Sequence, residues 1–175
     1  MAYAVELALD PTAADAVRHV RRELADAGIG YVARSGARPH VTLGIWDTLD
    51  FHGADTELTR FAVETDPVEL TLASVGLFPG IAVFLTPTVT IGLLGLHASF
   101  HRRFARFGTG VWDHYREGTW VPHCTVATDM EPDQFATALA IAGRVPLPLQ
   151  CRLVDVGIVE FRPVKQLVSR TLGRR

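Results

Sequence analysis

The chain has 175 residues, 48% of them hydrophobic, which suits one domain that folds without help from disulfides or metals. No apolar run reaches the roughly 18 residues that a membrane span needs, and the first residues lack the pattern of a signal peptide. The formal net charge is −2, so the molecule as a whole does not attract nucleic acid and any RNA contact must be local.

The chain opens with a predicted strand followed by a long amphipathic helix. Residues 3–9 alternate in hydrophobicity and end at Asp10-Pro11, a helix N-cap followed by proline in the first turn. The helix expected at 11–27 carries an apolar stripe, and its arginines are assigned to the solvated face. The stripe comprises Ala14, Val17, Val20 and Leu24, and the arginines are Arg18, Arg21 and Arg22.

A second group of elements follows two glycines that end this helix. Residues 31–33 are expected to begin another strand, and 35–38 to form a turn. A helix is predicted near 54–64. Strong alternation in 68–77 and the return at 81–85 predict an antiparallel hairpin, which contains no catalytic residue type and is interpreted as scaffold.

The third group begins with a helix expected over 90–107. His97 and His101 lie four residues apart on this helix, so they share a face and could in principle bind zinc. The glutamate of the H-E-x-x-H arrangement is absent, which favours a surface or capping role instead.

The last third contains a loop, a helix and two strands. The loop at 108–118 contains Trp112, His114, Tyr115 and Arg116, and Tyr115 could stack on a nucleobase or simply anchor the loop. A helix is predicted over 131–142, and strands are predicted at 149–159 and 165–172.

One short pattern occurs twice, in Pro39–Leu43 and Pro122–Val126: proline, histidine, a small apolar residue, threonine and an aliphatic residue. On a strand, residues two apart share a face, so each copy presents an imidazole and a hydroxyl together. The four side chains are His40, Thr42, His123 and Thr125. Val41 and Cys124 must then point into a core.

Two such strands side by side would have the groups needed to open a phosphate ester. Imidazoles titrate near neutral pH and can act as base and acid, and hydroxyls can donate to phosphate oxygens. This scheme requires no metal and no cofactor. The competing interpretation is a chance match between two strands with partly buried, hydrogen-bonded histidines.

These two motifs resemble the hallmark of the 2H phosphoesterases, which include bacterial 2′-5′ RNA ligase-like proteins and cyclic phosphodiesterases. The resemblance implies an α+β fold with two antiparallel sheets lining a central cleft, helices outside and an approximate internal twofold. Residues 1–175 would then form a single bilobed domain. It also implies His123 as the base and His40 as the acid.

The expected activity is therefore metal-independent hydrolysis of 2′,3′-cyclic phosphates or 2′-5′ phosphodiesters of RNA ends or small nucleotides, with 2′-5′ ligation as its reverse. One alternative is an RNA-end or nucleotide-binding module that keeps the fold without useful catalysis. Another is a zinc hydrolase that uses some of the seven histidines. No obligate protein partner and no membrane association are expected.

Expectations also attach to four other side chains: Arg38, Tyr115 and the two cysteines. Arg38 shares a face with His40 if the strand already runs through Pro39, which makes it a candidate phosphate contact. Tyr115 is the other candidate substrate contact. Cys124 and Cys151 lie in apolar strand-like runs and are interpreted as buried thiols of a cytoplasmic, reducing compartment.

Overall fold

The computed structural model describes residues 2–161 and 163–173. The strands are β1 (Ala2–Leu9), β2 (His40–Leu49), β3 (Val68–Phe78), β4 (Ala82–Pro87), β5 (Gly108–Val111), β6 (Cys124–Thr128), β7 (Leu149–Phe161) and β8 (Lys165–Thr171). The helices are α1 (Pro11–Asp26), α2 (Tyr31–Arg34), α3 (Phe51–Glu64), α4 (Ile91–Phe104) and α5 (Gln134–Ala142), with a 3-10 turn at Asp113–Tyr115. All paired strands are antiparallel, so the structure confirms the predicted α+β class.

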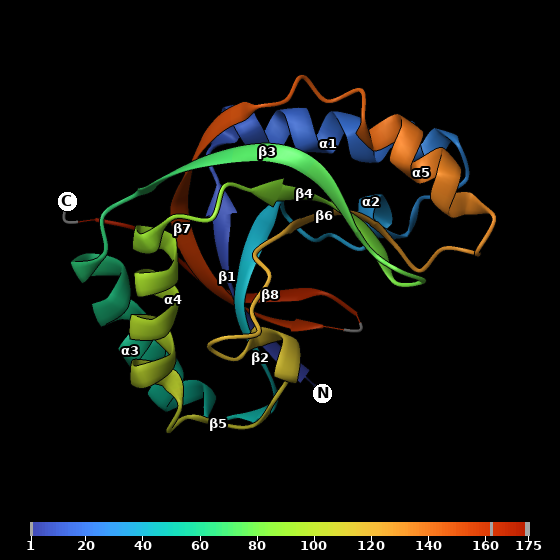
Figure 1. Ribbon diagram of the computed structural model, residues 1–175. Helices are drawn as coiled ribbons and strands as arrows, with labels where there is room; N and C mark the ends of the chain where they lie inside the picture. The colour runs from blue at the N-terminus through green and yellow to red at the C-terminus, as the bar shows by residue number, and fades with distance from the viewer. Residues whose placement is uncertain (1, 162, 174–175) are drawn as a thin grey trace.

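The sheet turns about its longest strand, β7. Residues 153–161 of β7 pair with β1, whereas residues 149–153 pair with β3. The strand order is β5-β2-β1-β7-β3-β4-β6, with β8 attached to β7 beside this path. Figure 1 shows β3 and β4 arching across the top while β1 and β2 run down the centre. The two expected sheets are thus two halves of one hydrogen-bonded sheet that share β7.

Two pairs of helices lie outside the sheet, one pair for each half. Helices α1 and α5 lie side by side along one half, and α3 and α4 lie side by side along the other (Figure 1). The predicted stripe of α1 is buried, and Asp10 caps this helix by accepting from the amide of Ala13 at 3.1 Å. Within the described residues, none of the helices is long and apolar enough to cross a membrane.

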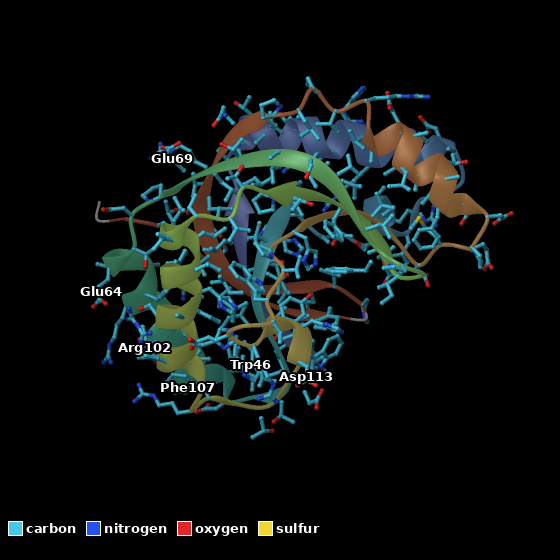
Figure 2. The ribbon with its side chains drawn as sticks, in the orientation of Figure 1. Trp46, Glu64, Glu69, Arg102, Phe107 and Asp113 are labelled. Atoms are coloured by element: carbon cyan, nitrogen blue, oxygen red, sulfur yellow. The ribbon has the colours of Figure 1, made fainter. Side chains whose placement is uncertain are left out.

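Aromatic side chains form the core between α3, α4 and the sheet. Phe61 and Phe100 meet edge to face with ring centroids 5.8 Å apart, and Trp46 from β2 lies 5.9 Å from Phe100. Figure 2 shows Trp46 in the interior, while Glu64 and Arg102 project outward from α3 and α4. The packing on this side holds β2 in place, and β2 carries the first motif.

Two expectations about local structure are wrong. Residues 31–33 do not begin a strand; they belong to the short helix α2, whose turn is closed by hydrogen bonds from Arg34 N to Gly30 O and from Ser35 N, just after the helix, to Tyr31 O. A single helical turn needs no neighbouring strand to satisfy its backbone. The segment predicted as a loop at 108–118 contains β5 and the 3-10 turn, because β5 pairs with the end of β2.

Candidate active site

A pocket of about 200 Å³ brings the two repeated motifs together. His40 and Thr42 line it from the start of β2, and His123 and Thr125 line it from β6 and the residue before it. The intervening Val41 and Cys124 are both fully buried, as the alternation of a strand requires. The structure thus places all four side chains of the motifs around one space. Tyr115 lines the same pocket.

Both histidines are oriented by a backbone carbonyl two residues earlier in the chain. His40 Nδ1 lies 2.6 Å from the carbonyl oxygen of Arg38, and His123 Nδ1 lies 2.6 Å from that of Val121. A carbonyl can only accept a hydrogen bond, so Nδ1 carries the proton in each ring. Nε2 is therefore the nitrogen left available for a substrate in both motifs.

Arg21 of α1 ties the second motif to the segment that precedes the first. Its Nε and Nη2 donate to the carbonyl oxygen of Thr125 at 3.3 and 2.7 Å, and its Nη1 donates to that of Ala37 at 2.6 Å. The residue is only 4% exposed and lines the pocket. Its assignment to the solvated face of the helix is therefore wrong. The spacing Val17, Arg21, Leu24 could have placed it on the buried stripe.

Trp120 adds a second tie between the two motifs. Its indole Nε1 donates to the carbonyl oxygen of Thr42 at 3.0 Å, inside the protein. The residue is 8% exposed and comes three positions before His123. Buried donors of this kind are costly to leave unpaired, so the contact fixes the approach of the second motif to β2.

A buried carboxylate adjoins the first histidine. Glu6 of β1 is 2% exposed, lines the pocket, and places Oε2 3.2 Å from Nδ1 of His40. Reasoning from the sequence missed this residue, although an acidic side chain inside the apolar run of 4–9 was the available signal.

Arg38 holds this carboxylate instead of lining the pocket. Its Nε donates to Glu6 Oε1 at 2.6 Å and its Nη1 to Asp155 Oδ1 at 2.5 Å. Arg38 is absent from the described residues that line the pocket. Its guanidinium lies against β7 at Gly157, where a Cβ would stand 2.5 Å from Nη2. Arg38, which we expected to contact phosphate, is thus engaged in ion pairs with Glu6 and Asp155 instead.

The second histidine lies among aromatic rings. Phe78 meets His123 edge to face at 5.1 Å, Phe84 lies at 5.1 Å, and Tyr115 at 6.3 Å. Burial, and to a lesser extent the charge of His40, lowers the pKa of His123. Burial raises the pKa of Tyr115 to about 12, so its hydroxyl stays protonated and can donate a hydrogen bond.

His97 and His101 serve the fold away from the pocket. His97 is 2% exposed, donates from Nε2 to the carbonyl of Tyr115 at 3.1 Å, and stacks on Trp120 with centroids 3.9 Å apart. His101 Nε2 lies 2.9 Å from the carbonyl of Leu43. The favoured surface role is wrong for His97. In the described part of the chain, no three metal-ligating side chains gather.

The two cysteines are buried and unpaired with each other, as expected. Burial raises the pKa of the Cys124 thiol, and it raises that of Cys151 to about 12. Both thiols are therefore protonated at neutral pH, which argues against Cys124 as a nucleophile beside His123.

The family comparison matches most of the chain. The model of the 2'-5' RNA ligase superfamily matches residues 9–163. No curated protein matches in a sequence search.

Several solved structures share the fold at low identity. The protein TT0787 of Thermus thermophilus aligns over 100% of both chains, with 18% identity and a TM-score of 0.61. E. coli LigT in its apo form aligns over 98% of this chain and 97% of its own, with 16% identity and a TM-score of 0.59. A structure described as a phosphoesterase aligns over 98% of both chains, with 15% identity and a TM-score of 0.58.

Proposed function

The chain belongs to the 2'-5' RNA ligase superfamily, and on this premise we propose that it is a metal-independent phosphodiesterase. Its substrates are 2′,3′-cyclic phosphates or 2′-5′ phosphodiesters of RNA ends or small nucleotides. The observation that carries the proposal is that His40, Thr42, His123 and Thr125 all line the same pocket.

The reaction needs one proton removed and one proton supplied. His123 accepts the proton of the attacking water at Nε2 as the water oxygen bonds to phosphorus. His40 then donates the Nε2 proton to the sugar oxygen that leaves when its bond to phosphorus breaks. General acid and base catalysis of this kind contributes roughly 10² to 10⁴ in rate for each group.

The environments of the two rings support this division of roles. The lowered pKa of His123 keeps its imidazole neutral near pH 7, as a base requires. The Glu6 carboxylate lies beside His40, where it offsets the positive charge of an imidazolium, as an acid requires. The burial of His123 and the carboxylate beside His40 therefore support the acid and base that the family resemblance implies.

The remaining groups of the pocket surround the phosphate and the nucleobase of the substrate. The hydroxyls of Thr42 and Thr125 donate to the non-bridging oxygens, where negative charge accumulates in the transition state. Arg21 brings a guanidinium to the same wall, where its partners are carbonyl oxygens. The ring of Tyr115 lies near that of His123 and is a candidate surface on which the nucleobase of the substrate stacks.

Solved structures with this fold support small nucleotide substrates. E. coli LigT, at 16% identity and a TM-score of 0.56, has a structure with 3'-AMP, and another with phosphate at a TM-score of 0.53. By microscopic reversibility the same groups allow a 5′-hydroxyl to attack the cyclic phosphate, which forms a 2′-5′ linkage. Water is far more concentrated than any RNA hydroxyl, so hydrolysis is the expected net reaction.

The test is turnover of 2′,3′-cyclic AMP and 2′-5′-linked diadenosine in EDTA by wild type and by His40→Ala and His123→Ala. Each variant is expected to lose at least about 10²-fold in kcat. His19→Ala is the matched control, because the His19 side chain is 66% exposed on α1. Unaltered activity in either motif variant removes that histidine from the mechanism. Binding of both nucleotides without any product favours the alternative, a nucleotide-binding module.

A further inference from the structure

A second depression, of about 340 Å³, lies between α1 and the segment 32–38. Its charged lining consists of arginines, and its remaining lining is small or apolar: Arg18, Arg21, Arg22 and Arg38 on one hand, Val32, Ala33, Gly36 and Ala37 on the other. No carboxylate belongs to this lining within the described part of the chain. We refer to it as the arginine pocket.

The positive charge of the arginine pocket is only partly neutralised. Arg38 is paired with Glu6 and Asp155, and Arg18 is paired with Asp15 one turn earlier on α1. For residues 2–161 and 163–173, neither Arg21 nor Arg22 has an ion pair: Arg21 donates to carbonyls, and Arg22 is exposed. The protein as a whole carries a net charge of −2, so this pocket is a local departure from the rest of the molecule.

The arginine pocket adjoins the candidate active site. Arg21, Val32 and Ala37 line both spaces, so the wall between them is one arginine side chain and the segment that leads into β2. The arginine pocket therefore shares a wall with the space that His40 and His123 line.

On the basis of the proposed function, we propose that the arginine pocket binds a second phosphate group of the substrate. The substrate class is then a nucleotide chain with at least one phosphate besides the one that reacts, rather than a mononucleoside cyclic phosphate. Arginine suits this task, because its planar fork of donors matches phosphate oxygens and its charge persists at every physiological pH.

The experiment compares two substrates that differ by one phosphate. Adenosine 2′,3′-cyclic phosphate carries only the reacting phosphate, whereas the dinucleotide ApA with a terminal 2′,3′-cyclic phosphate carries a second one. The measured quantity is the ratio of kcat/KM for the dinucleotide to kcat/KM for the mononucleotide. Wild type is expected to favour the dinucleotide about tenfold or more.

Arg22→Glu and Arg18→Glu are expected to lower this ratio at least fivefold. Both residues are exposed on α1, so the substitutions leave the core intact. Arg102→Glu makes the same change of charge on the exposed side of α4 and is expected to keep the wild-type ratio. A wild-type ratio near one, or equal ratios in Arg22→Glu and Arg102→Glu, overturns the proposal.

A binding measurement separates this proposal from the proposed function. If wild type hydrolyses neither substrate, the proposed function fails and the arginine pocket is judged by equilibrium dialysis of ApA with a terminal 3′-phosphate. Arg22→Glu is then expected to bind at least fivefold more weakly than Arg102→Glu. The slope of log affinity against log salt should also become shallower by roughly 0.7, the contribution of one phosphate on a single strand. Equal affinities and equal slopes overturn the proposal.

Discussion

Glu6 Oε2 lies 3.2 Å from Nδ1 of His40, and its other oxygen accepts from Arg38 at 2.6 Å. His123, in the matching motif, has phenylalanine and tyrosine rings around it and no carboxylate contact in the part of the chain that the structure describes. The two motifs read alike in the sequence, but one histidine adjoins a buried ion pair and the other lies among aromatic rings. That difference is what assigns acid and base in the proposed reaction.

Replacing the carboxylate beside His40 should slow the chemical step. In Glu6→Gln the imidazolium loses the negative charge that compensates it, so we expect kcat to fall by about one to two orders of magnitude while KM changes less than about twofold. Steady-state kinetics on 2′,3′-cyclic AMP measures both. Glu69→Gln, at an exposed site on β3, is the matched control and should leave both constants unchanged. A rise in KM with constant kcat would instead assign Glu6 to ground-state binding.

The acidic limb of the pH–rate profile should report the burial of His123. Because its pKa is lowered, His123 stays neutral and basic below the ordinary value of 6.5, so kcat/KM should hold as pH falls through 6.5 and decline only lower. Phe78→Ala lets water reach the ring, raises this pKa toward 6.5 and should move the decline to higher pH. Leu77→Ala, at the exposed neighbouring position, should leave the limb in place. An unmoved limb in Phe78→Ala would show that another group sets it.

Arg21 should contribute to the stability of the fold. Arg21→Met leaves the carbonyls of Thr125 and Ala37 without their donors, so we expect a loss of about 2–4 kcal/mol in the free energy of unfolding. Arg21→Lys retains one donor group, so its free energy of unfolding should lie between those of wild type and Arg21→Met. Urea denaturation measures the change. Arg22→Met, one residue along on the exposed face, should stay within about 0.5 kcal/mol of wild type.

His97 should make the fold sensitive to acid. Burial and the charge of His101 lower its pKa to about 4 in the folded protein, against 6.5 for an unperturbed histidine. Between these values the unfolded chain binds the extra proton, so stability is full above pH 6.5 and falls as pH drops toward 4. The contribution is on the order of 3 kcal/mol.

The check is chemical denaturation of wild type and His97→Phe at pH 7.5 and pH 4.5. His97→Phe loses the hydrogen bond to Tyr115 O and should be less stable than wild type at pH 7.5. Its free energy of unfolding should nevertheless fall less between pH 7.5 and pH 4.5 than that of wild type. In His19→Ala, at an exposed site, the free energy of unfolding should fall between the two pH values as much as in wild type. Identical losses in wild type and His97→Phe would contradict the prediction.

Patterns that act along one element were predictable from the sequence. Alternation placed Val41 and Cys124 inward and set the strands 3–9 and 68–77 close to their observed bounds. Helical spacing identified the buried stripe of α1. These inferences hold because side-chain direction repeats every 2 or 3.6 residues, whatever the element packs against.

Groups whose role depends on a partner elsewhere in the chain needed the tertiary structure. In the sequence Arg21 resembles a solvated charge, but in the fold it donates to the carbonyl of Thr125, 104 positions away. Glu6 and Arg38 come from different parts of the chain, and only their meeting shows which histidine has a carboxylate. The sequence by itself determined the two motifs and the faces they present. The folded chain decided their surroundings, because burial and charge depend on what lies nearby in space.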